Sequence, residues 1–129
     1  MPLVHDELCF GCGRANLFGL MLEVDETAPG NVAGHGFIKQ DHRGPRRGAA
    51  HHGIVSAALA EAMALACGLK AQPLAVTVAF LDNAAVGAFL EVEASIEDRT
   101  PDGIDVTASA RSEERIVARA RGTYMVPDD

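Results

Sequence analysis

Apolar and polar residues alternate through most of the second half of the chain. The stretches LEVEASIE at 90–97 and IDVTASAR at 104–111 place an apolar residue at every second position. Such alternation is typical of a β-strand with one buried and one solvated face. Similar patterns at 74–82 and about 115–126, with turn-forming residues at 83–87 and 100–103, predict four consecutive strands joined by hairpins. The expected apolar faces are Leu74, Val76, Val78 and Phe80 in the first of these strands and Ile116, Ala118, Ala120 and Tyr124 in the last.

The first half of the chain combines weaker strand patterns with one long apolar segment. Residues 17–25 (LFGLMLEVD) predict a short strand, and residues 32–39 predict a second one that its glycines weaken. After a loop at 40–50, the small and apolar residues of 53–67 predict a helix that ends at Gly68. The order of two strands, a helix and four strands indicates an α+β fold with an antiparallel sheet.

Glu61 is the one charged residue in the predicted helix, which is otherwise apolar on all sides. Such a helix is expected to be wrapped by sheet or by a partner subunit. Burial of an unpaired carboxylate costs several kcal/mol, so Glu61 requires hydrogen-bond partners, a proton or a water-filled cleft. It is either a functional acid beside a pocket walled by alanines, or a structural carboxylate bonded to backbone or to an arginine at a subunit interface.

His51, His52 and Gly53 stand at the start of this helix. Backbone N–H groups and the positive end of the helix dipole meet there, so a carbonyl oxygen that gains negative charge could be held at this point. The alternative is that an imidazole only caps the helix or faces solvent.

Composition restricts the partners that the chain can have. A length of 129 residues fits one domain, and 48% hydrophobic with 22% charged residues is ordinary for a folded globular protein. A net charge of -7 argues against nucleic acid or an anionic membrane as the main partner. We see no signal peptide in the first residues. The apolar run 53–69 is too rich in Ala and Gly for a membrane span. Three cysteines, a low and odd number, fit a reducing cytoplasm.

Two motifs resemble a known family. HHGIVSAALAEAM, from 51 to 63, resembles the HGG-x6-D/E helix of hotdog-fold acyl-CoA thioesterases of the phenylacetate-degradation type, and CFGCGRANLFGL, from 9 to 20, resembles the CFGCG-x2-NPxGL opening of one branch. The resemblance implies a single hotdog domain over 1–129, with an antiparallel sheet wrapped around one central helix. It also implies hydrolysis of a small or medium acyl-CoA, or of an aromatic one, by a homodimer or dimer of dimers. Coenzyme A would be part of the substrate, and no separate cofactor is expected.

The same resemblance assigns roles to individual residues. Gly53 and His52, beside His51, would hold the thioester carbonyl, and Glu61 would activate water or attack the carbonyl directly. The residues expected to contact substrate are Asn16, Arg46, Arg47, Ile54, Ala57 and Ala58. Where relatives continue their third strand with Phe-Leu-Arg-Pro, this chain has Phe-Leu-Asp-Asn, so Arg46 and Arg47, or Arg119 and Arg121, are candidates for phosphate contacts.

The register of the helix motif leaves two interpretations open. Alignment of His51 with the family histidine puts Ala60 at the usual acid position, whereas alignment of His52 puts Glu61 there and Ile54 in place of a glycine. One residue along a helix is a rotation of ~100°, so the two registers direct an acid differently. The chain is therefore expected to be a thioesterase, or a hotdog protein that binds acyl-CoA without cleaving it.

Two further hypotheses rank below these. A hotdog dehydratase shares the Glu61-Ala62-Met63-Ala64 segment but normally has a histidine where this chain has Arg47. His5, Cys9 and Cys12 form H-x3-C-x2-C, which could bind a metal ion, but no second cysteine pair completes it. We therefore expect no metal, and we expect Cys9 and Cys12 to pack at the turn into the first strand.

Overall fold

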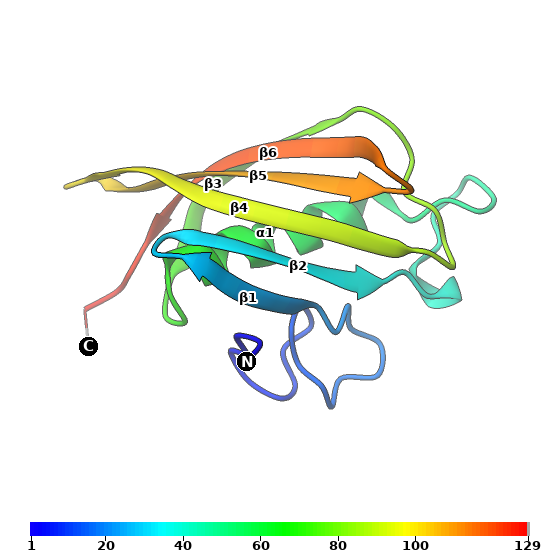
Figure 1. The fold of residues 1–129 in the computed structure, drawn as a ribbon, viewed down its shortest axis with the longest axis horizontal. Coiled ribbons are helices and arrows are strands. Elements are labelled where there is room, and N and C mark those ends of the chain that lie inside the picture. The colour runs from blue at the N-terminus through cyan, green and yellow to red at the C-terminus, as the bar shows by residue number, and fades with distance from the viewer. Residues whose placement is uncertain (129) are drawn as a thin grey trace.

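A six-stranded antiparallel sheet curves around one long helix in the computed structural model, which describes residues 1–128 (Figure 1). The elements are β1 (Glu23–Ala28), β2 (Asn31–Phe37), the 3-10 turn η1 (Gln40–His42), α1 (His52–Cys67), β3 (Gln72–Phe80), β4 (Phe89–Thr100), β5 (Gly103–Ser112) and β6 (Arg115–Met125). The strand order is β1-β2-β4-β5-β6-β3, so the α+β prediction is confirmed. Residue 129 of the predicted 1–129 domain lies outside the described residues.

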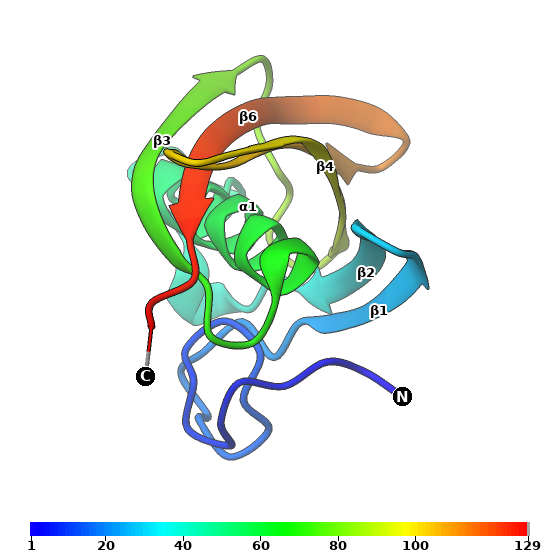
Figure 2. The same ribbon diagram turned by 90° about the vertical axis from the view of Figure 1, so that its left-hand side faces the viewer.

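The sheet forms an arc with α1 on its concave side (Figure 2). Leu59 and Met63 of the helix are fully buried, together with Leu90 of β4 and Tyr124 of β6. Burial of large apolar side chains from both layers is the main stabilising contribution to such a core. Gly68 ends the helix as predicted, with its N–H donating to the carbonyl of Ala64.

β3 is an edge strand that pairs only with β6 among the described strands. Val76 and Val78 pack against the core as expected, but Phe80 of the same alternation is 43% exposed, and Leu74, at a register shift between Pro73 and Ala75, is 57% exposed. This edge therefore leaves large apolar side chains uncovered in a single chain.

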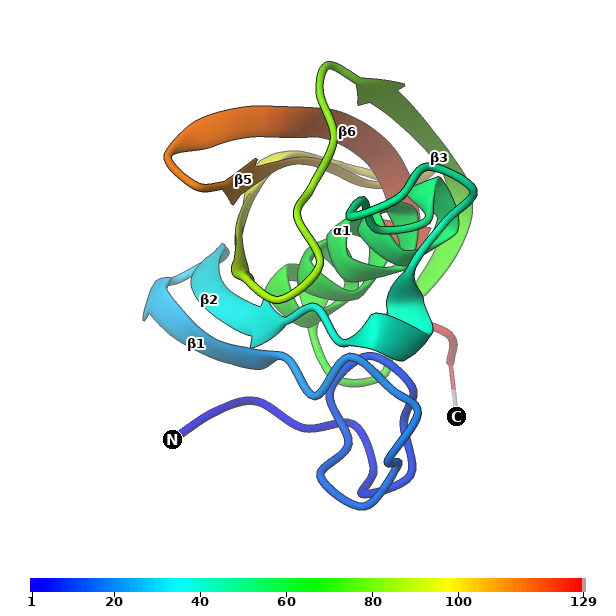
Figure 3. The same cartoon turned by 90° about the vertical axis from the view of Figure 1, so that its right-hand side faces the viewer.

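The predicted strand at 17–25 is wrong in its first part, because β1 begins at Glu23. Leu20 and Leu22 are buried as the alternation implied, but their N–H groups donate to the carbonyls of Phe10 and Gly11, at 2.7 and 2.9 Å. Residues 17–22 thus belong to an N-terminal loop (residues 1–22) that closes the side of α1 away from the sheet (Figures 2 and 3). The alternation thus predicted correctly which side chains are buried, but the backbone of this segment bonds to residues 10 and 11 and not to a neighbouring strand.

A register shift interrupts the predicted face of β6. Ala118, Ala120 and Tyr124 are buried as expected, whereas Val117 is fully buried and Ile116 only partly so. The pairing with β5 slips between Ala110 and Arg111, and such a bulge turns the next side chain to the other face. None of the helices in residues 1–128 is long and apolar enough to cross a membrane.

Candidate active site

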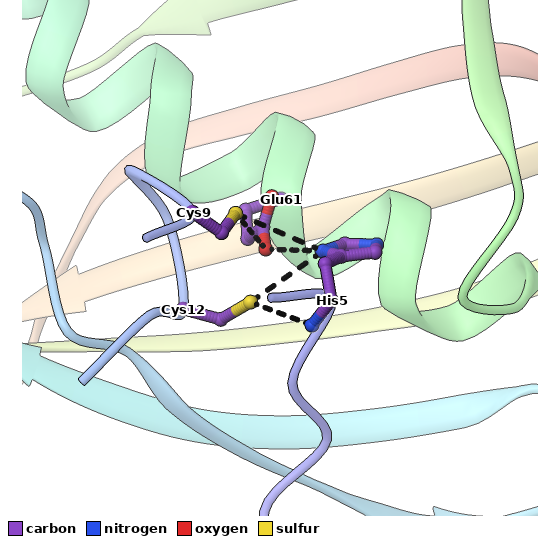
Figure 4. Close-up of side chains that lie close together, drawn as sticks. All are labelled: His5, Cys9, Cys12 and Glu61. Atoms are coloured by element: carbon purple, nitrogen blue, oxygen red, sulfur yellow. Dashed lines mark hydrogen bonds and ion pairs between the residues drawn. The ribbon is translucent and has the colours of Figure 1, made fainter. Parts of the chain in front are cut away.

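The carboxylate of Glu61 meets side chains of the N-terminal loop (Figure 4). Its Oε2 lies 2.8 Å from Nδ1 of His5 and accepts a hydrogen bond from the Cys9 thiol at 3.5 Å. The His5 and Glu61 side chains are 19% and 14% exposed. Glu61 thus has the hydrogen-bond partners that its burial requires, and they come from a segment more than 50 residues away in the chain.

The CFGCG segment approaches the helix closely. A Cβ atom at Gly11 would lie 2.4 Å from Cδ of Glu61, a distance that real carbon atoms do not adopt. Glycine at position 11 is therefore what allows the loop backbone to pass over the carboxylate. Asn16 stabilises the same loop, since its Nδ2 donates to the carbonyl of Leu8 at 3.1 Å and its Oδ1 accepts from the N–H of Phe18 at 3.1 Å.

Cys12 is the buried member of this group. Its Sγ lies 3.5 Å from Nδ1 of His5 and accepts a hydrogen bond from the backbone N–H of His5 at 3.2 Å. Burial, and to a smaller extent the neighbouring Glu61 carboxylate, raises the pKa of the Cys12 thiol from 9.0 to about 12. Without a cation in the cluster, Cys12 is therefore a neutral thiol at physiological pH.

A groove of about 350 Å³ runs along the part-exposed face of α1 beside Glu61. Its floor is made of small helix residues, Ala57, Ala60 and Ala64, and Tyr124 forms part of one wall. The Tyr124 hydroxyl donates to the Ala60 carbonyl at 2.8 Å. Both positions that the two sequence registers offered for the acid, 60 and 61, therefore line one groove, and only Glu61 carries a carboxylate there.

His51 caps α1 with its side chain. Its Nδ1 accepts a hydrogen bond from the Gly53 N–H at 2.8 Å, so the neutral imidazole carries its own proton on Nε2. The His52 ring lies against Phe80 of β3, with centroids 4.7 Å apart. All of His51, His52 and Gly53 are exposed, so this helix start presents an N–H donor on His51 to any ligand outside.

The two parts of the predicted catalytic group lie far apart within one chain. Gly53 and Glu61 are eight residues apart in α1, which at 1.5 Å per residue is about 12 Å along the axis. A single thioester carbonyl cannot contact both.

The remaining predicted contacts divide into several groups. Ile54 and Ala57 are part-exposed on α1, whereas Ala58 is fully buried in the core and out of reach of a ligand. Arg46 and Arg47 are exposed in the loop that precedes α1. The alternative pair, Arg119 and Arg121, lines a separate hollow of about 470 Å³ over β3 to β6, which Glu93 shares.

Sequence reasoning did not connect His5, Cys9 and Cys12 with Glu61. The sequence offered two separate indications of this contact. One is a buried carboxylate that needs a partner, and the other is an H-x3-C-x2-C segment that supplies only three of the four ligands of a tetrahedral metal site. Both cysteines lie before β1, as expected, and their thiols face the helix.

Comparisons with known proteins found solved structures with a similar fold. A point mutant of the phenylacetic acid degradation protein PaaI from Thermus thermophilus is 28% identical, with a TM-score of 0.74 over 81% of this chain and 92% of that chain. The PaaI protein from the E. coli phenylacetic acid degradation operon is 18% identical, with a TM-score of 0.77 over 84% of this chain and 81% of that chain.

The fold is the hotdog fold. A third structure with it, a hypothetical thioesterase protein from Streptococcus pneumoniae with coenzyme A, is 16% identical, with a TM-score of 0.74 over 84% of this chain and 87% of that chain. No family model and no curated protein sequence matches this chain. The predicted fold is thus confirmed, and the chemistry rests on the site itself.

Proposed function

We propose that this protein hydrolyses acyl-CoA thioesters at a site built from two copies of the chain. The observation that carries the proposal is the Glu61 carboxylate on the alanine floor of the groove along α1. Solved hotdog structures described as a hypothetical thioesterase with coenzyme A and as PaaI proteins of phenylacetic acid degradation support the same class of substrate.

The proposed site combines residues of two subunits. About 12 Å along α1 separates Gly53 from Glu61, so the carbonyl-binding helix start of one copy would work with Glu61 of the other. The apolar edge at Leu74 and Phe80, both exposed, is a suitable surface for the second copy. A homodimer is then the smallest unit with complete sites.

The chemistry is a general-base hydrolysis. The Nε2–H of His51 and the positive end of the α1 dipole stabilise the thioester oxygen as it gains negative charge. Glu61 takes a proton from a water molecule whose oxygen bonds to the carbonyl carbon. The tetrahedral intermediate then breaks its C–S bond, and the CoA sulfur leaves and takes up a proton. His5 orients the acid through its 2.8 Å hydrogen bond to Oε2.

The substrate class follows from the groove and from charge. Alanine side chains on its floor leave room for a small or medium acyl chain or an aromatic ring. Exposed Arg46 and Arg47 lie in the loop next to the helix start and would contact phosphates of coenzyme A. Coenzyme A is substrate here, and the proposed reaction uses no other cofactor.

One observation favours a second candidate function, binding of acyl-CoA without cleavage. Glu61 is only 14% exposed and already bonded to His5, and Gly53 donates its N–H to His51. A carboxylate and an N–H that are both occupied are poorer catalysts than free ones.

Hydrolysis of a panel of acyl-CoA thioesters, followed with a free-thiol reagent, tests the proposal. We expect wild type to release thiol from at least one ester, and Glu61→Gln to lower kcat at least about a hundredfold. Glu26→Gln, which removes an exposed carboxylate on β1, is the matched control and should keep full activity. If wild type is no faster than Glu61→Gln on every ester and still binds CoA esters, the protein is a binder.

A further inference from the structure

Four side chains with metal-ligating atoms converge between the N-terminal loop and α1. Nδ1 of His5, Sγ of Cys9, Sγ of Cys12 and a carboxylate oxygen of Glu61 all lie within 4.8 Å of one another. Figure 4 shows them pointing toward a common centre, three from the loop and one from the helix. We call these four residues the His/Cys/Glu cluster.

The spacing of the cluster matches a tetrahedral zinc site. With Zn–S of about 2.3 Å and Zn–N of about 2.0–2.1 Å, a tetrahedron separates sulfur from nitrogen by about 3.5 Å. The two sulfurs lie 3.9 Å (Cys9) and 3.5 Å (Cys12) from Nδ1 of His5. Sγ of Cys9 is 3.5 Å from Oε2 of Glu61.

A fourth pair, Nδ1 of His5 and Oε2 of Glu61, is 2.8 Å apart because a hydrogen bond joins the two atoms, and the other two pairs lie within 4.8 Å. A tetrahedral ion would hold this nitrogen and oxygen about 3.3 Å apart. Rotation of either side chain provides that small widening.

The backbone around the cluster is fixed by its own hydrogen bonds. The N–H of Gly13 donates to the Cys9 carbonyl at 2.9 Å, and the N–H of Leu22 donates to the Gly11 carbonyl at 2.9 Å. The N–H of His5 donates to Sγ of Cys12 at 3.2 Å, an interaction that stabilises a metal-bound thiolate. The loop thus presents its three ligands without rearrangement.

The donor set selects the ion. Two thiolates and one imidazole prefer zinc over the hard cations magnesium and calcium, which take oxygen ligands. Four protein ligands around one centre are typical of closed zinc sites that stabilise a fold.

We propose that His5 Nδ1, Cys9 Sγ, Cys12 Sγ and Glu61 Oε2 bind one Zn²⁺ ion, which fastens the N-terminal loop to the central helix. The proposal does not rest on thioester hydrolysis, although both use Glu61. The ion would replace the hydrogen bond between His5 Nδ1 and Glu61 Oε2 and hold both side chains in its place. Coordination through Oε2 leaves Oε1 as the carboxylate oxygen that can meet substrate. Hydrolysis and metal content are therefore separate measurements with separate outcomes.

Metal content of the full chain tests the site. The protein is purified without a histidine tag, exchanged into metal-free buffer with added Zn²⁺, desalted and analysed by mass spectrometry for metals. We expect about one zinc per chain in wild type and at least a tenfold loss in Cys9→Ser and Cys12→Ser. Cys67→Ser, which changes a cysteine outside the cluster, should keep full zinc. Zinc below a tenth per chain in wild type, or equal zinc in all variants, overturns the proposal.

Cobalt substitution keeps the test decisive if the serine variants fail to fold. Wild type loaded with Co²⁺ should show thiolate-to-cobalt charge-transfer bands and the visible bands of a tetrahedral ion, and Glu61→Gln should alter them without removing the thiolate bands. Absence of thiolate bands overturns the site, as does a Cys9–Cys12 disulfide found by intact mass in protein purified under reducing conditions. Loss of hydrolysis together with altered cobalt bands in Glu61→Gln supports both proposals, whereas zinc binding without any hydrolysis overturns only the enzymatic one.

Discussion

Nδ1 of His5 lies 2.8 Å from Oε2 of Glu61, although 56 residues separate them in the chain. This pair joins the N-terminal loop to the single carboxylate of the central helix. Any reaction that uses Glu61 therefore depends on the position of residues 5–12, and substitutions in the loop should affect a site on the helix.

Gly11→Ala tests that dependence by steric means. A Cβ at this position would lie 2.4 Å from Cδ of Glu61, so either the loop or the carboxylate has to move. We expect the free energy of unfolding to fall by about 1–3 kcal/mol in urea denaturation. Gly87→Asn is the control for loss of a glycine without a steric clash, since a Cβ there meets nothing within 4 Å and asparagine adopts a positive φ such as 85° at a smaller cost than other side chains. Equal stability of Gly11→Ala and wild type would contradict the close approach.

Tyr124 predicts a pH dependence of stability. Burial, followed by Cys67 and Glu61, raises the pKa of its phenol well above the ordinary 10.0. The folded state therefore keeps the phenol proton that the unfolded chain begins to lose near pH 10. The contribution of Tyr124 to the free energy of unfolding is thus fully present below pH 10 and decreases as the pH rises further.

This prediction can be measured on one chromophore, because the chain has one tyrosine and no tryptophan. Absorbance should show no phenolate near pH 10 in the native protein and a normal titration in urea. Tyr124→Phe, which also loses the hydrogen bond to Ala60, should cost about 0.5–1.5 kcal/mol at neutral pH and remove this contribution to the alkaline loss. A native titration near pH 10 would show that the ring is accessible.

Subunit complementation tests the two-copy site. His51→Asn keeps a capping oxygen for Gly53 but lacks the Nε2–H donor, so it should fold normally and be at least about a hundredfold slower. Equal amounts of His51→Asn and Glu61→Gln, unfolded and refolded together, should regain about a quarter of wild-type activity, because half of the dimers then contain one intact site. If the mixture is no more active than the separate variants, His51 and Glu61 act within the same subunit, or one of them takes no part in the reaction.

Chelation should release the N-terminal loop, because the proposed zinc ion fastens this loop to α1. Leu17 and Phe18 in that loop are 74% and 73% exposed, so chymotrypsin can reach their side chains once the backbone is free to move. We expect a strong chelator to increase cleavage within residues 1–22 several-fold and added zinc to reverse it, whereas sites within α1 stay protected. In Cys12→Ser the same cleavage should occur without chelator. Unchanged cleavage in wild type would mean that the loop is held without metal.

The alternation of apolar and polar residues predicted most of the fold, because most strands have one solvent-exposed face. In β4 and β5, charged and hydroxyl side chains alternate with Val, Ile and Ala, so the boundaries were nearly correct. The pattern was misleading at Leu20 and Leu22, where the buried residues alternate but the backbone bonds to Phe10 and Gly11 instead of to a strand. Alternation reports which side chains are inside and not which segment supplies the hydrogen bonds.

The candidate site was only half visible in the sequence. Glu61 was conspicuous because a carboxylate in an apolar helix needs a partner, and the cap role of His51 was one of the two alternatives open for it. The convergence of His5, Cys9 and Cys12 on Glu61 has no local signal, since ligands from two distant segments meet only after the loop folds over α1. Gly11 gave no such signal either, because the reason for its small size appears only where its backbone lies against Glu61.

The sheet order has a consequence for how the protein is made. β6 lies between β5 and β3, so residues 115–125 are interior in the sheet although they are synthesised after the other five strands. A nascent chain therefore presents α1 and β3 before the strands that cover and join them exist. The sheet is complete only when β6 has been made, and until then the apolar helix is a surface for chaperones or for aggregation.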